Sequence, residues 1–206
     1  VESVDDAVGR IMATLEELKL AERTLVLFTS DNGGLMRVTD NAPLRDGKGS
    51  PYEGGIRVPL IAWWPGNIPP GTQSDAPISS IDYFPTVAEA LGVPLDHSVD
   101  GQSLWKTMSD GDGAEERDLF WHFPQYRYNQ VGPYSIVRSG DWKLIRYYDP
   151  EPYGVNRVEL FNLAADLGEK HDLAGEQTEK ANELEALLDA WLETVGARLP
   201  VEQSEG

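Results

Sequence analysis

The chain has 206 residues, of which 40% are hydrophobic and six are tryptophan, enough to bury a sizeable core in one or two domains. Its formal net charge of -18 argues against nucleic acids and anionic membrane surfaces as partners. The absence of cysteine excludes disulfides and thiolate metal sites, and no apolar run has the length of a transmembrane helix. We therefore expect a folded protein with no nucleic-acid partner and no membrane partner.

The first half of the chain alternates helical and strand patterns. Apolar residues recur at helical spacing over residues 4–20 and predict an amphipathic helix. Short apolar runs at residues 24–28 and 58–64 predict buried strands. Residues 80–91 predict another helix. A helix followed by a strand is typical of α/β architecture, so we expect a sheet with flanking helices.

A polar segment divides the chain near its middle. Residues 109–113 are poor in apolar side chains, as linkers between packed units are, so we expect one domain at 1–108 and a smaller one at 115–206. Short β-type runs in the second domain predict a small antiparallel sheet. They lie at residues 118–123, 134–138, 142–148 and 158–163. Leu184 to Val195 carry an apolar stripe that predicts a C-terminal helix packed on this sheet through its leucines and Trp191.

A carboxylate, an amide and two glycines follow the first predicted strand. Ligands of open α/β sheets lie beyond the carboxyl ends of the strands, so the side-chain oxygens of Asp31 and Asn32 can converge on a cation there. The same residues are also those of an ordinary Asn-Gly turn. Both interpretations stay open at this point.

A second signal lies in the long loop over residues 30–57. Lys48 stands between two glycines, which let the backbone come close to a ligand while the ammonium supplies a point charge for an oxyanion. A solvated surface lysine is the alternative. The other charged side chains of the loop are expected to hold its shape through charge-assisted hydrogen bonds to its own backbone. These are Arg45, Glu53 and Arg57.

Together these segments resemble the sulfatase family, within the alkaline-phosphatase-like superfamily. The likeness is carried by FTSDNGG and NAPLRDGKGSPYEGGIRVP and extends over nearly the whole chain, through residues 80–86, 100–104, 119–124 and 139–144. It implies the end of an alkaline-phosphatase-like mixed sheet with flanking helices, followed by the small antiparallel sheet and its helix. The family's paired aspartates and the segment that yields its formylglycine nucleophile do not occur in these residues. We therefore expect the C-terminal part of a sulfatase.

The resemblance also implies roles for single residues. Asp31 and Asn32 would be ligands of a divalent cation, in this family usually Ca²⁺, whose other ligands come from the preceding part of the fold. Lys48 would hold a sulfate oxygen close to the leaving oxygen. Formylglycine is expected in the part that is missing here. The complete protein is expected to be periplasmic or secreted.

His122 is the second catalytic candidate, as a histidine that contacts the substrate from the aromatic segment Phe120 to Pro124. A buried ring with both nitrogens satisfied is the alternative. The surrounding aromatic side chains, with Tyr126 and Tyr128, suit a wall on which a carbohydrate stacks.

The expected function is that of a sulfuric ester hydrolase fragment, acting when complete on a sulfated carbohydrate or an aryl sulfate. Its partner would be a small-molecule or glycan sulfate ester. A phosphoester or phosphonate hydrolase of the same superfamily is one alternative, since both chemistries need an oxyanion site with a metal. A non-catalytic fragment that binds anionic glycans is the other.

Overall fold

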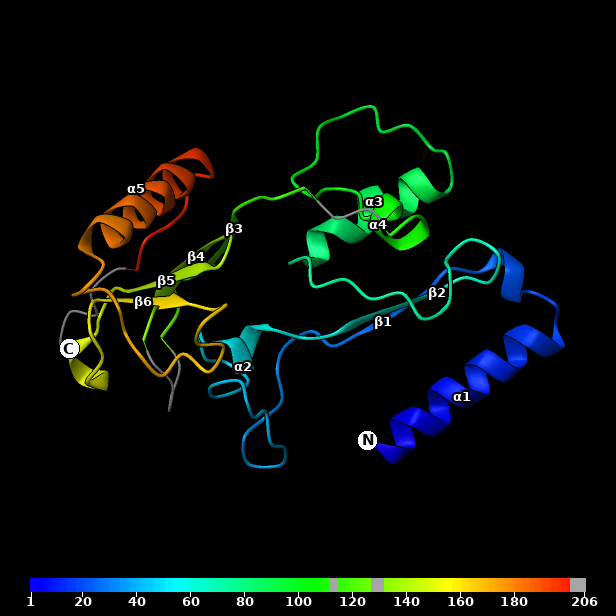
Figure 1. Cartoon of the computed structure of the whole chain (residues 1–206), viewed down its shortest axis with the longest axis horizontal. Coiled ribbons are helices and arrows are strands. Elements are labelled where there is room, and N and C mark those ends of the chain that lie inside the picture. Colours follow the sequence, from blue (N-terminus) through cyan, green and yellow to red (C-terminus); the bar gives the residue numbers. More distant parts are fainter. Residues whose placement is uncertain (112–114, 127–131, 201–206) are drawn as a thin grey trace. The chain divides into compact units, whose positions relative to one another are not determined.

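The computed structural model describes residues 1–111, 115–126 and 132–200 (Figure 1). The chain forms two compact units, the first made of Val1–Thr29 and Pro59–Glu115, the second of Ser30–Val58 and Glu116–Gly206. The predicted linker over residues 109–113 lies partly outside the described residues. Within the described parts, no helix is long and apolar enough to cross a membrane.

The first unit combines helices with a two-stranded antiparallel sheet. Its helices are α1 (Glu2–Glu17), α3 (Tyr83–Ala90) and α4 (Trp105–Ser109), and its strands are β1 (Val26–Thr29) and β2 (Leu60–Trp63). Short 3₁₀ turns cover Ala21–Arg23 and Ser80–Asp82. The strands pair from Val26 opposite Trp63 to Thr29 opposite Leu60. Helices α1 and α3 and both strands lie where the apolar patterns predict them, whereas α4 is an element that the patterns do not predict.

Much apolar surface of the first unit is not covered. Helix α1 has no buried residue, although it carries the predicted apolar stripe. Large apolar side chains are exposed on both strands and on the helices: Val4, Ile11, Leu18, Phe28, Ile61, Phe84 and Leu91. This unit therefore gains less from burial than a separate domain of its size, and association through these faces is expected.

The second unit is built on a four-stranded antiparallel sheet in the order β3-β4-β5-β6. The strands are β3 (Leu119–Phe123), β4 (Tyr134–Ser139), β5 (Trp142–Tyr147) and β6 (Val158–Asn162). A 3₁₀ turn at Glu151–Tyr153 lies between the last two strands. The β4–β5 hairpin turns at Gly140, whose φ of 55° is readily adopted by glycine.

Helix α5 (Thr178–Thr194) packs on one face of this sheet, as the apolar stripe predicts. Leu184, Leu188 and Leu192 are buried against strand residues of that face, Val137, Leu144 and Leu160. Trp191 stacks on Phe120 with ring centroids 4.8 Å apart. Val195 departs from the prediction, since the helix ends at Thr194 and the side chain of Val195 is 53% exposed.

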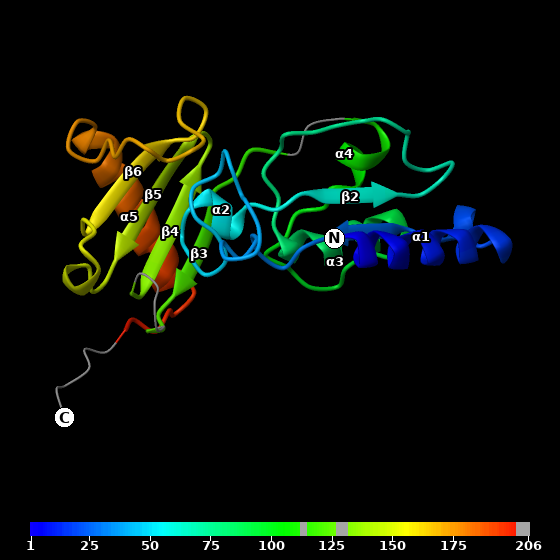
Figure 2. The same cartoon turned by 90° about the horizontal axis from the view of Figure 1, so that it is seen from below.

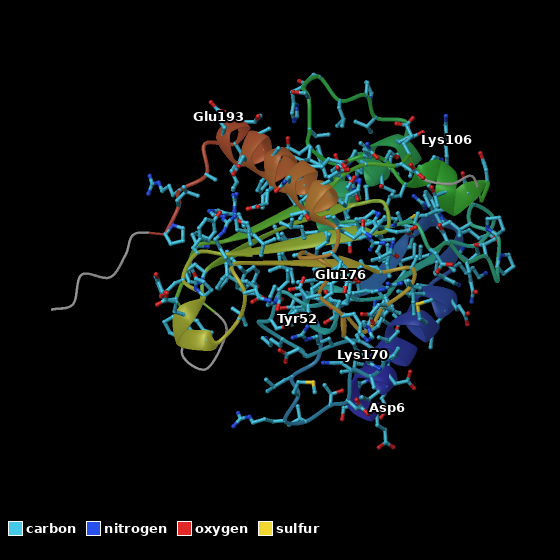
Figure 3. All side chains as sticks on the ribbon, turned by 60° about the vertical axis from the view of Figure 1, so that its left-hand side comes forward. Asp6, Tyr52, Lys106, Lys170, Glu176 and Glu193 are labelled. Atoms are coloured by element: carbon cyan, nitrogen blue, oxygen red, sulfur yellow. The ribbon has the colours of Figure 1, made fainter. Side chains whose placement is uncertain are left out.

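The opposite face of the sheet is covered by the loop that contains helix α2 (Glu53–Ile56), as Figures 1 and 2 show. Adjacent strand residues point to opposite faces, so Ile136, Ile145 and Phe161 lie on this side. Tyr52 from the loop is buried among them, 3% exposed. Figure 3 shows Tyr52 and Glu193 of α5 on opposite sides of the strands.

The predicted α/β class, with a small antiparallel sheet packed by a C-terminal helix, is confirmed. Residues 30–58 belong to the compact unit of that sheet, although they lie inside the expected first domain, 1–108. The physical reason is the apolar and ionic anchorage of the loop on the sheet. The division into domains at 1–108 and 115–206 stays a prediction.

We expect Leu188→Ala to destabilise the second unit by about 2–5 kcal/mol, because Leu188 is fully buried between α5 and the sheet. The same change at Leu199, which is 55% exposed, should alter the free energy of unfolding by less than about 0.5 kcal/mol. Urea denaturation followed by far-UV circular dichroism measures both. Equal effects of the two substitutions would contradict the packing of α5 described above.

Candidate functional site: a cavity in the loop over residues 30–58

The loop over residues 30–58 is folded by hydrogen bonds between its two ends. The N–H of Gly33 donates to the carbonyl of Gly55 at 3.0 Å, and the N–H of Lys48 donates to the carbonyl of Gly34 at 3.0 Å. The side-chain amide of Asn41 donates to the carbonyls of Gly34 and Asp46, both at 2.9 Å. The segment after β1 is thereby held against the segment that carries Lys48.

Glycines are required where these segments meet. A Cβ on Gly33 would lie 1.7 Å from the carbonyl oxygen of Gly54. Similarly, a Cβ on Gly54 would lie 2.2 Å from the oxygen of Asp46, and one on Gly55 would lie 2.3 Å from the oxygen of Ser50. No side chain fits at such distances, so the backbones pack directly on each other.

A cavity of about 350 Å³ lies at this junction. Three of the four predicted site residues line it together, namely Asp31, Asn32 and Lys48. Its remaining wall consists of Gly49, Ser50, Gly55, Ile56 and, from the sheet, Tyr134. The cavity wall therefore carries one ammonium group, four oxygen-bearing side chains (Asp31, Asn32, Ser50 and Tyr134) and the apolar side chain of Ile56.

These residues fit a divalent cation only in part. Asp31 and Asn32 offer oxygen ligands of the type that Ca²⁺ prefers, but Ca²⁺ takes six to eight oxygens. Among the described residues no three His, Cys, Asp or Glu side chains come together in a way that could hold a metal ion. Asp31 and Asn32 could therefore supply at most part of a Ca²⁺ ligand set, and their role as metal ligands stays a prediction.

A buried ionic cluster lies outside the cavity and anchors the loop to the sheet. The Nζ of Lys143, on β5, is 3.0 Å from Oε1 of Glu53 and 2.7 Å from Oε1 of Glu169. The N–H of Glu53 donates to Oε2 of Glu169 at 2.6 Å, and Nη1 of Arg57 lies 3.6 Å from Oε2 of Glu53. Burial raises the pKa of Glu169 above its usual range, and the charge of Lys143 opposes this shift.

Glu169 also adopts a strained backbone. Its φ of 51° is left-handed and costs a residue other than glycine about 1 kcal/mol. Its own carbonyl accepts a hydrogen bond from Nη1 of Arg45 at 2.7 Å. The surrounding contacts therefore fix both the side chain and the backbone of Glu169.

A second buried group joins the loop to the sheet beside this cluster. The hydroxyls of Tyr52 and Tyr147 donate to Oε2 of Glu159, at 2.7 and 3.1 Å. Burial and the negative charge of Glu159 raise the pKa of both tyrosines, so both stay protonated at neutral pH. The guanidinium of Arg45 lies 3.6 Å from the centre of the Tyr52 ring.

The expected structural role of the charged loop residues needs one correction. Arg45 and Glu53 do hold the loop in shape, but their side chains bind the C-terminal segment and the sheet, rather than the loop's own backbone. The reason is burial. The loop packs on the sheet, and a charged side chain buried between them needs a partner on the sheet side. Sequence reasoning missed Lys143 and Glu169, since neither is near the loop in sequence.

The structure does not bring His122 to the cavity. His122 lies on β3 opposite Ser135, on the face that α5 covers, whereas the loop lies on the other face. Its Nδ1 is 2.8 Å from Oγ of Ser135, and its Nε2 donates to the carbonyl of Arg198 at 2.9 Å. Both ring nitrogens of the half-buried His122 therefore have partners, and its contact with a substrate stays a prediction. Tyr128 lies outside the described residues.

We expect Gly33→Ala to disrupt the cavity, because its new Cβ would overlap the carbonyl of Gly54. Protection of the loop amides from hydrogen exchange should fall while that of α5 is kept. Gly9→Ala is the matched control, since a Cβ there meets nothing within 4 Å and alanine favours the helix by about 1 kcal/mol. Unchanged loop protection in Gly33→Ala would contradict the close packing.

Comparison with known proteins connects this chain to one family. The family model described as Sulfatase matches residues 1–93. A sulfatase of Formosa agariphila is 37% identical over 217 aligned residues, which cover 93% of this chain and 38% of that protein. The chain thus spans about two fifths of the length of this relative.

Solved structures share the same architecture. The crystal structure of Ps i-CgsB in complex with k-i-k-neocarrahexaose gives a TM-score of 0.77 at 28% identity, over 91% of this chain and 40% of that one. A protein solved in complex with its substrate, D-glucosamine-2-N,6-O-disulfate, gives a TM-score of 0.77 at 25% identity, over 98% and 40% of the two chains. A phosphonate monoester hydrolase of Silicibacter pomeroyi is 23% identical, with a TM-score of 0.71 over 93% of this chain and 39% of that one, and shows a likeness of fold alone.

Proposed function

Because the chain belongs to the sulfatase family, we propose that it is part of a sulfuric ester hydrolase and that its loop cavity binds the sulfate group of the substrate. The observation that carries the proposal is the convergence of Asp31, Asn32 and Lys48 on one cavity. These are the charge and the oxygen donors that an oxyanion with a bound cation requires.

The role proposed for Lys48 is electrostatic. Its ammonium would lie beside a sulfate oxygen and stabilise the negative charge that develops on the leaving oxygen as the sulfur–oxygen bond breaks. The chain carries a net charge of -18, so this local positive charge must outweigh a repulsive field around the anion. A flexible lysine between glycines supports that role, because the anion can approach both the ammonium and the backbone.

Asp31 and Asn32 are proposed to donate two oxygens to a divalent cation, expected to be Ca²⁺. The remaining ligands and the formylglycine nucleophile would come from the part of the family fold that these residues do not contain. When bound, the cation would supply positive charge to the sulfate oxygens. For His122 we propose a structural role, because both its nitrogens are engaged on the face covered by α5.

The proposed substrate is a sulfated carbohydrate or an aryl sulfate. The substrate named for one structural relative, a disulfated glucosamine, supports the carbohydrate. Tyr134 and Ile56 at the cavity wall offer apolar surface to a sugar or an aromatic ring. We place the complete protein in the periplasm or outside the cell, by family resemblance.

Phosphate or phosphonate ester hydrolysis is the weaker alternative, because the phosphonate hydrolase shares only the fold at 23% identity. A glycan-binding chain without catalysis is the other. Under the first alternative the complete protein would hydrolyse phosphate or phosphonate esters, and under the second it would hydrolyse no ester.

The 206-residue chain alone should not hydrolyse an activated aryl sulfate, since positioning cannot replace a covalent nucleophile. In the complete protein that carries it, Lys48→Ala should lower kcat for sulfate ester hydrolysis by about 10²–10³-fold. Lys106→Ala, the same change at an exposed lysine of α4, should leave kcat unchanged. Turnover by the isolated chain, or an unaffected Lys48→Ala enzyme, would overturn the proposal.

Calcium should stabilise the isolated chain little. With only Asp31 and Asn32 as side-chain ligands in the cavity, a millimolar concentration should raise Tm by about 1 °C at most. Thermal unfolding with and without calcium, in the original chain and in Asp31→Ala, measures this. A rise of many degrees that disappears in Asp31→Ala would mean that the chain carries a complete metal site.

A further inference from the structure

Three of the charged side chains that are buried outside the cavity lie in one cluster and have no part in the proposed chemistry. Lys143 and Glu169 are fully buried, and Glu53 is 2% exposed. We infer that Lys143, Glu53 and Glu169 form a positioning cluster for Lys48, Asp31 and Asn32. This inference rests on the proposed sulfate-binding role of the cavity, but the position of the loop can be measured without any ligand.

The cluster holds helix α2 by its first residue. The carboxylate of Glu169 bridges two groups, since one oxygen lies 2.7 Å from Nζ of Lys143 and the other accepts the N–H of Glu53 at 2.6 Å. The side chain of Glu53 returns to the same ammonium at 3.0 Å. Both the backbone and the side chain of Glu53 are therefore fixed to β5, directly or through Glu169.

Backbone hydrogen bonds connect α2 to the segments that line the cavity. The carbonyl of Gly55 accepts the N–H of Gly33 at 3.0 Å, directly after Asp31 and Asn32. The N–H of Gly54 donates to the carbonyl of Arg45 at 2.9 Å, at the base of the turn that carries Lys48. A Cβ at these glycines would overlap the facing backbone, so α2 packs directly on the segments that carry the cavity residues.

The charge pairing with Lys143 fixes the position of Glu53, and with it the start of α2. Two carboxylates share one buried ammonium. Arg57 lies 3.6 Å from the Glu53 carboxylate, and Arg45 donates to the backbone carbonyl of Glu169 at 2.7 Å. Without the ammonium of Lys143, both carboxylates would lose their buried charge partner and would move toward water. Since Glu53 starts α2, that movement would lift α2 and the cavity walls from the sheet.

The test uses the 206-residue chain with Lys143→Met, which keeps an unbranched side chain, one atom shorter, and removes its charge. Hydrogen exchange should become roughly tenfold faster at the amides of Gly33, Lys48 and Gly54, with the amides of β4 and α5 unchanged. Inorganic sulfate, titrated against the NMR signal of the Lys48 side chain, should shift that signal in the original chain. The shift should be lost in Lys143→Met.

Two further variants make the outcomes distinct. Asp189→Asn cuts the 2.6 Å pair with Arg146 on the α5 face and should leave the Lys48 signal and the loop exchange unchanged. Glu169→Gln is the milder variant for the case that Lys143→Met also loses α5 protection, and it should loosen the loop alone. Loop exchange that stays at the original rate in a folded Lys143→Met or in Glu169→Gln would overturn the positioning role. If sulfate fails to shift the Lys48 signal in the original chain while the loop loosens as expected, the proposed function fails and the positioning role stands.

Discussion

The contact between the buried ammonium of Lys143 and two carboxylates is the interaction on which the geometry of the site depends. The loop over residues 30–58 has no regular structure beyond the four residues of α2. Its fixed shape comes from the ionic cluster, from Tyr52 in the apolar core and from close backbone packing at glycines. A buried ion pair adds little net stability compared with apolar residues, but it selects one arrangement of its partners.

That arrangement explains how a cavity lined by polar side chains can have a fixed geometry. Asp31, Asn32 and Lys48 line it from segments that are joined by backbone hydrogen bonds and by the side-chain amide of Asn41. The side chains are thus directed at the cavity by a backbone that the sheet holds in place. For the proposed sulfate chemistry this matters, because preorganised charge stabilises a transition state without further rearrangement.

Much of this architecture is predictable from the sequence. Apolar periodicity predicts α1, α5 and all six strands, because local spacing decides which face is buried. Asp31, Asn32 and Lys48 stand out through their glycine neighbours. The cluster partners do not, because Lys143 and Glu169 are far from the loop in sequence and lie among other charged residues, and only the fold brings them to the loop. His122 is the converse case, in which a conspicuous residue proves to be fully hydrogen-bonded on the other face.

The coupling between Glu53 and Lys143 tests the anchorage of the loop most directly. A double-mutant cycle measures the free energy of unfolding of the original chain, Glu53→Gln, Lys143→Met and the double variant. It isolates the interaction between the two residues. The account predicts a coupling free energy of about 0.5–3 kcal/mol. The double variant should lose less free energy of unfolding than the two single variants lose together. Effects that add within about 0.3 kcal/mol would show that the two residues act independently, and would contradict the anchorage described here.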